Sequence, residues 1–175
     1  MSMASPGGLL PRDIDELAAR VISENHEAGR MITTAESCTG GLVTGALTEI
    51  AGSSAVVDRG FVTYSNEAKM EMLGVSSDII ETFGAVSIAC VWAMAEGALN
   101  RSRADVAVAI SGVAGPGGGT RLKPVGTVVF ARAFRNHNGE PEGELKHFDG
   151  GDDPEKARAM IRQQATICAL ELLLP

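Results

Sequence analysis

The sequence predicts a three-layer α/β/α domain around a mixed, mostly parallel sheet of about five strands. Segments with helical spacing alternate with short apolar segments along the chain, which is the pattern of α/β proteins. One segment, residues 106–110, is a continuous apolar run of the kind found in strands that are buried on both faces. Two strands late in the chain have no helix between them, which indicates one antiparallel strand.

The first half of the chain begins with an amphipathic helix whose apolar residues recur at helical spacing over 14–22. Pro11 suits its first turn and Gly29 its end. The elements expected next are a strand at 31–35, a helix from 42 to about 50, a strand at 56–64, and short helices at 66–73 and 78–83.

The second half begins with a long helix for which Ser87 is the predicted N-cap. The buried strand 106–110 follows, and a glycine-rich loop at 113–124 separates it from a strand at 125–134. Residues 145–148 indicate a weak edge strand. Asp153 and Pro154 have the N-cap and first-turn chemistry of a final helix, whose apolar face is predicted to include Met160.

Composition limits the possible functions. A chain of 175 residues predicts a single domain, expected at 9–174, with a flexible tail at 1–8. The net charge of −7 argues against nucleic-acid or anionic-membrane binding, and no apolar run approaches the roughly 18 residues of a membrane span. Three separated cysteines without a CxxC pair favour neither disulfides nor a metal, so we expect no metal, no cofactor and a cytoplasmic location.

The first candidate site is the segment 35–41, where a strand turns into a helix. Such a junction directs free backbone N–H groups at one point, so a nucleophile there would find oxyanion donors at Thr39, Gly40 and Gly41. Ser37 and Cys38 compete for that nucleophilic role. A thiol is intrinsically the better nucleophile, but Cys38 can equally pack inward as a small apolar residue. The residues alone leave the choice open, and a plain glycine-rich turn explains them as well.

The second candidate site is Tyr64 with Lys69, at the junction of the strand 56–64 and the following helix. Ser65 or Asn66 is the expected N-cap, which places Lys69 in the first turn. There the helix dipole disfavours a cation and lowers the lysine pKa, as a lysine general base requires. The alternative interpretation is a solvated lysine on an exposed helix face.

Two further segments offer anion contacts. The loop 111–124 follows a buried strand, and its glycines allow close approach to a ligand, with Ser111 at its start. A flexible connector explains the same composition. Arg158 and Arg162 lie four residues apart on the last helix, where a phosphate would relieve their mutual repulsion, although solvated arginines are an equally simple explanation.

Five segments taken together resemble one family. They are residues 35–41, 60–66, 84–87, 111–116 and 123–128, and they occur in the family's order. The sequence looks like that of CinA C-terminal domains, the nicotinamide-nucleotide amidases, from about Leu9 to Leu174. The resemblance implies a three-layer fold and hydrolysis of the carboxamide of nicotinamide mononucleotide, giving nicotinate mononucleotide and ammonia in pyridine-nucleotide recycling.

The same resemblance implies Ser37 as the nucleophile, with Tyr64 and Lys69 as its activating partners, and so favours Ser37 over Cys38. On this hypothesis neutral Lys69 takes the serine proton, directly or through Tyr64. The partner is a small pyridine nucleotide, and we expect a homo-oligomer with a dimer favoured. The residues expected to bind the substrate are Thr39, Gly40, Gly41, Ser111, Gly115, Gly118, Arg158 and Arg162.

Two other functions remain open at the level of sequence. One is a non-catalytic nucleotide-binding module, associated with competence or damage responses, in which the same amides and arginines hold a phosphate. The other is a cysteine hydrolase that uses Cys38 with a distant histidine. Release of ammonia from the mononucleotide, lost in Ser37→Ala and kept in Cys38→Ala, would separate the three.

Overall fold

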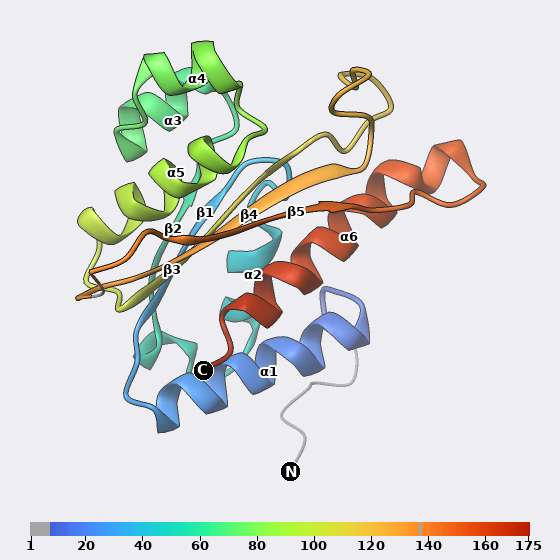
Figure 1. Ribbon diagram of the computed structural model, residues 1–175. Helices are drawn as coiled ribbons and strands as arrows, with labels where there is room; N and C mark the ends of the chain where they lie inside the picture. Colours follow the sequence, from blue (N-terminus) through green and yellow to red (C-terminus); the bar gives the residue numbers. More distant parts are fainter. Residues whose placement is uncertain (1–7, 137) are drawn as a thin grey trace.

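The computed structural model describes residues 8–136 and 138–175, and shows a five-stranded sheet covered by helices on both faces (Figure 1). The tail expected at 1–8 lies outside the described residues except for Gly8. The strands are β1 (Ile32–Glu36), β2 (Val57–Val62), β3 (Val106–Gly112), β4 (Thr127–Phe134) and β5 (Glu142–His147). The helices are α1 (Arg12–Glu27), α2 (Leu42–Glu49), α3 (Asn66–Leu73), α4 (Ser77–Phe83), α5 (Ile88–Asn100) and α6 (Pro154–Leu172), with a short 3-10 turn at Ser53–Ala55.

The strand order is β2-β1-β3-β4-β5. β1 is parallel to both of its neighbours, and β4 is antiparallel to both β3 and β5. The predicted mixed sheet with one antiparallel strand is therefore confirmed. The carboxyl ends of β1, β2 and β3 consequently meet at one edge of the sheet, where α/β proteins place their ligands.

The two faces of the sheet carry different side chains because residues alternate along each strand. Val108 and Ile110 of β3 face the larger core, which packs against α1, α2 and α6. Ala107 and Ala109 face the smaller core, which packs against α3, α4 and α5. Figure 1 shows these two sets of helices on opposite sides of the sheet. The small alanine side chains let α5 lie close to the strands.

The predicted helix starts have the expected chemistry. Ser65, Ser87 and Asp153 each accept a backbone N–H bond with the side chain at the start of α3, α5 and α6. Each such cap contributes about 1 kcal/mol. One detail of the sequence analysis is wrong: Met160 is 39% exposed, not part of the apolar face of α6. No helix among the described residues combines the length and apolar character needed to cross a bilayer.

Candidate active site

The carboxyl ends of β1 and β2 lie side by side, because the two strands are parallel and Glu36 pairs with Val62. Ser37 follows β1 directly. The chain after β2 turns at Ser65 and enters α3, whose Lys69 N–H bonds the Ser65 carbonyl. Side chains in a helix point toward its N-terminus. Lys69 therefore reaches back across the strand ends toward Ser37.

The Lys69 amine lies 2.9 Å from the Ser37 hydroxyl oxygen. It also lies 2.9 Å from the Thr63 carbonyl oxygen and 3.1 Å from that of Tyr64. The Lys69 residue is 1% exposed and Ser37 is 7% exposed, and no carboxylate of the described residues is ion-paired with this amine. The Ser65 carbonyl oxygen lies farther away, at 3.5 Å. The two nearer carbonyls accept two amine hydrogens, and the third position of the nitrogen faces the serine hydroxyl.

Burial is the main cause that lowers the pKa of Lys69 from its ordinary value of 10.5. A charged amine loses hydration in this setting, and the surrounding carbonyls only partly replace it. The direction agrees with the sequence analysis, which attributed it to the helix dipole. Desolvation, a consequence of tertiary packing, is the principal cause instead.

Cys38 is buried, and that burial raises the pKa of its thiol to about 12. At neutral pH the sulfur is therefore protonated and weakly nucleophilic. None of the residues that line the surrounding cavity is a histidine, and His147 instead contacts Thr127. The cavity thus supplies Cys38 with no histidine base from the described residues.

Tyr64 contributes to the site through two different groups. Its carbonyl accepts from Lys69, whereas its phenol oxygen accepts a 3.3 Å hydrogen bond from Arg158. The tyrosine is 62% exposed, so its ring stands at the mouth of the site. The other Arg158 nitrogen donates to the Gly115 carbonyl. Arg158 therefore connects α6, Tyr64 and the start of the glycine-rich loop.

These groups line an open cavity of about 230 Å³. Five of the lining residues were predicted from the sequence: Ser37, Lys69, Tyr64, Arg158 and Ser111. Ser111 is almost fully buried. Cys38, the competing nucleophile, also lines it, as do Asn66, Gly112 and Ala114 from the candidate segments, and Ala85 and Val86 from outside the candidate sites. Ala85 and Val86 come from the segment between α4 and α5, and only the tertiary fold brings them here.

The glycine-rich loop meets this cavity through its first residues. Gly115 is buried and its carbonyl accepts from Arg158, whereas Gly118 is exposed; both adopt a positive φ, of 77° and 82°. Lys123, at the far end of the loop, donates to the carbonyl of Phe83 at the end of α4. The loop is thus attached to α6 at one end and α4 at the other.

The start of α2 is held by Glu36, which the sequence analysis missed. Its fully buried carboxylate accepts the N–H groups of Gly41, Val43 and Thr44, and also the Thr44 hydroxyl. The Gly40 N–H donates to the Ser37 carbonyl. Of the three N–H groups expected to hold an oxyanion, those of Gly40 and Gly41 are therefore occupied within the protein.

Arg162 does not share the cavity of Arg158. Its guanidinium donates to the carbonyl oxygens of Cys38 and Thr39, at 3.0 and 3.2 Å. It lines a separate cavity between α1, α2 and α6. The two arginines predicted to bind one phosphate thus line two different cavities.

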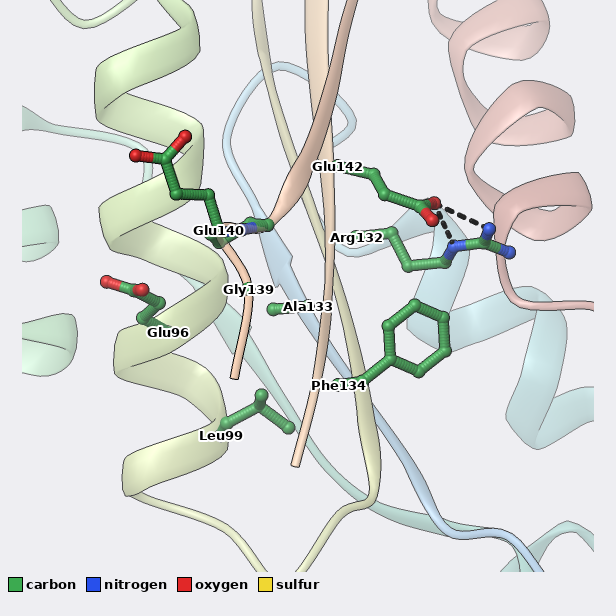
Figure 2. A pocket seen from close by; sticks show the side chains of 9 residues that line it. Glu96, Leu99, Arg132, Ala133, Phe134, Gly139, Glu140 and Glu142 are labelled. Carbon is green, nitrogen blue, oxygen red and sulfur yellow. Dashed lines mark hydrogen bonds and ion pairs between the residues drawn. The ribbon is translucent and has the colours of Figure 1, made fainter. Parts of the chain in front are cut away.

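A third cavity lies at the other end of the sheet, between the C-terminal half of α5 and the β4–β5 turn (Figure 2). The carboxylates of Glu96 and Glu140 lie beside it, and Arg132 is ion-paired with Glu142. Its lining contains no serine, cysteine or lysine. Within the described residues no group of three histidine, cysteine or acidic side chains is placed to hold a metal ion. Among the three cavities described, the one at Ser37 is therefore the one that holds a nucleophile beside an amine.

Comparisons with known proteins give a consistent result. A family model described as the CinA C-terminal domain matches residues 14–175. Nicotinamide-nucleotide amidohydrolase PncC of Escherichia coli (strain K12) is 48% identical over 161 residues, which is 92% of this chain and 93% of that protein. A CinA-like protein of Akkermansia muciniphila is 54% identical over 75% of this chain and 31% of its own. The crystal structure of competence/damage inducible protein CihA from Agrobacterium tumefaciens superposes with a TM-score of 0.87 at 53% identity, covering 95% of this chain and 97% of that one.

Proposed function

This chain belongs to the CinA C-terminal domain family, and from that membership and the geometry around Ser37 we propose that it is an amidase acting on nicotinamide mononucleotide. The products are nicotinate mononucleotide and ammonia. The name of the PncC relative, at 48% identity over most of both chains, supports an amide of a nicotinamide nucleotide as substrate. The observation that carries the mechanism is the 2.9 Å contact between the Lys69 amine and the Ser37 hydroxyl.

The proposed reaction begins with neutral Lys69. Its two N–H bonds donate to the carbonyls of Thr63 and Tyr64, so its lone pair faces the Ser37 hydroxyl. As Ser37 attacks the amide carbon, its proton moves to Lys69. The direct contact supports transfer without a phenol between them, because the Tyr64 hydroxyl is instead paired with Arg158.

The second half of the reaction returns that proton. The C–N bond of the tetrahedral intermediate breaks, the Lys69 ammonium protonates the leaving nitrogen, and ammonia departs from an acyl-enzyme ester on Ser37. Lys69, neutral again, then removes a proton from a water that attacks the ester. The acid is released and Ser37 takes back its proton. Each proton transfer of this kind contributes typically 10²- to 10⁴-fold in rate.

We expect the nucleotide to bind at the mouth of the cavity. Arg158 carries a positive charge beside the glycine-rich loop, with no carboxylate partner among the described ion pairs. A phosphate there would gain charge-assisted hydrogen bonds in a chain whose net charge is −7. Ser111 lines the cavity wall, which supports its proposed contact with the polar groups of the substrate. The three buried, free cysteines are in keeping with a reducing cytoplasm as the place of action.

The test is incubation of the protein with nicotinamide mononucleotide, with both products followed by mass spectrometry and an ammonia assay. We expect turnover by the parent protein, loss of at least 10³-fold in Ser37→Ala, and turnover within a few-fold of the parent in Cys38→Ala. Nucleotide binding without ammonia release would favour the non-catalytic module. Loss in Cys38→Ala with retention in Ser37→Ala would favour the cysteine hydrolase.

A further inference from the structure

The loop that carries the nucleophile is a four-residue turn, Ser37 to Gly40, closed by the 3.0 Å bond from the Gly40 N–H to the Ser37 carbonyl. Cys38 and Thr39 are its central residues. The peptide unit between them consists of the Cys38 carbonyl and the Thr39 N–H. This central peptide is the one that turns over between the two common types of β-turn. In the part of the chain that the structure describes, the Thr39 N–H donates to no other group.

Arg162 holds the carbonyl side of that peptide. Its Nε donates to the Cys38 oxygen at 3.0 Å, and Nη2 donates to the Thr39 oxygen at 3.2 Å. The guanidinium comes from α6 and lines a cavity of about 180 Å³ that shares no lining residue with the cavity of Ser37. Ser37 and Cys38 thus line one cavity, and the arginine that bonds the Cys38 carbonyl lines another.

A trans peptide directs its C=O and N–H groups in opposite directions. Because the Cys38 carbonyl points at Arg162, the Thr39 N–H of the same peptide points away from Arg162. We propose that Arg162 is a positioning residue that fixes the Cys38–Thr39 peptide, so that the Thr39 N–H donates to the oxyanion formed over Ser37. This inference rests on the proposed amidase activity and adds the group that prepares its oxyanion site.

The β-branched side chain of Thr39 also keeps the Cys38–Thr39 peptide in its present orientation. Turning the central peptide over would require a positive φ at Thr39, which is strongly disfavoured for a β-branched residue. In the described chain the only residue other than glycine with a positive φ is Asn136. Thr39 and Arg162 therefore form two independent restraints on one peptide, and removal of both should cost more than the two single losses combined.

A phosphate contact would make a different demand on Arg162. Two of its nitrogens already donate to backbone carbonyls, and it does not line the cavity that holds Ser37 and Lys69. The two roles are separated by two substrates: nicotinamide mononucleotide, and nicotinamide riboside, which has the same amide without the phosphate. A phosphate contact changes KM for the first alone, whereas an oxyanion restraint changes kcat for both.

The test measures kcat and KM for both substrates in Arg162→Ala, in Arg158→Ala, and in Lys156→Ala as the control on the exposed start of the same helix. For Arg162→Ala we expect kcat to fall about 10- to 100-fold on both substrates with KM within about twofold, since a lost oxyanion donor costs about 10²- to 10³-fold. Arg158→Ala should raise KM for the mononucleotide only, and Lys156→Ala should match the parent. Millimolar guanidinium ion should restore part of the kcat of Arg162→Ala, which a general loss of folding would not allow.

A double-mutant cycle with Thr39→Gly gives a second, independent readout. We expect the double variant Thr39→Gly/Arg162→Ala to lose at least tenfold more kcat than the product of the two single losses. If Arg162→Ala fails to fold, Arg162→Lys, which keeps one donor, replaces it in the cycle.

A KM increase confined to the mononucleotide, an unchanged kcat in Arg162→Ala, or strictly multiplicative losses in the cycle would each overturn the inference. A parent protein that releases ammonia from neither substrate would overturn the proposed function, and the inference with it. The two failures are therefore distinguishable.

Discussion

Replacing Glu36 with glutamine should destabilise the protein far more than an exposed carboxylate replacement does. The Glu36 carboxylate is fully buried at the start of α2 and accepts three backbone N–H groups and one hydroxyl. Gly41, at the N-cap position, supplies no side chain for that purpose. Glutamine preserves the shape but turns one acceptor oxygen into a donor.

The magnitude follows from the contacts. Two N–H groups can still meet the amide oxygen of the introduced glutamine, with the charge assistance lost. The Thr44 N–H, 3.0 Å from Oε2 of Glu36, would instead face an NH₂ group and remain buried without an acceptor. A hydrogen bond to a charged group is worth about 1.5–3 kcal/mol, and a buried unpaired donor costs about 1–3 kcal/mol. Loss of the negative charge at the helix N-terminus adds about 0.3–2 kcal/mol. We expect a total loss of about 3–5 kcal/mol.

The assay is urea unfolding followed by circular dichroism, together with calorimetry. For a chain of this size 1 kcal/mol shifts Tm by about 2–4 °C, so Glu36→Gln should lower it by about 6–20 °C. Glu49→Gln is the matched control, because Glu49 is exposed at the other end of the same helix; its effect should stay within about 0.5 kcal/mol. A loss below about 1 kcal/mol in Glu36→Gln would refute the account of this carboxylate as the cap of α2.

Four other predictions test the site and the packing. Because burial lowers the pKa of Lys69 and only its neutral form accepts the serine proton, kcat/KM should rise with pH through that lowered pKa; Lys69→Arg, charged at all accessible pH, should be inactive throughout a pH–rate profile. Between the lowered pKa and 10.5, Lys69 is neutral in the folded protein but protonated in the unfolded chain. The free energy of unfolding should therefore rise with pH across this range. Gly97→Ala should lose about 1–3 kcal/mol in urea unfolding, because the new methyl would overlap the Leu73 carbonyl oxygen, whereas Gly45→Ala in α2 meets nothing within 4 Å and should not destabilise. Iodoacetamide at pH 8 should leave Cys38 unmodified in the folded protein, as read by peptide mass spectrometry, because its thiol is buried with a pKa of about 12; modification of the native chain within minutes would contradict that burial.

The fold was accessible from sequence because its signals are local. Ser87 and Asp153 start helices through chemistry within three residues of each cap, and the apolar run that begins at Val106 is buried throughout its length. β5 was the weakest expectation, placed at 145–148, because its polar edge-strand residues alternate without an apolar run. Its pairing with β4 extends its start to Glu142, which only the partner strand determines.

The site was accessible only in part. Ser37 and Lys69 were found because each follows a strand end, and their contact needed only parallel pairing of those strands. The different contacts of Arg158 and Arg162 carried no sequence signal, since residues four apart on a helix share a face in any helix. Which of the two reaches the Ser37 loop depends on how α6 crosses the sheet. Glu36 ends a buried strand, and nothing in the sequence distinguished its carboxylate from a misplaced polar residue.

The position of β2 has a consequence for how this catalyst would fail. β2 is an outer strand, hydrogen-bonded to the rest of the sheet along β1 alone, and the segment that follows it delivers Lys69. Ser37, in contrast, follows a strand that is paired on both sides. Separation of β2 from β1 would move the Lys69 amine away from the Ser37 hydroxyl while both hydrophobic cores stayed packed. Turnover therefore depends on the pairing of β2 with β1. It can be lost in a molecule that every global measure of folding still reports as folded.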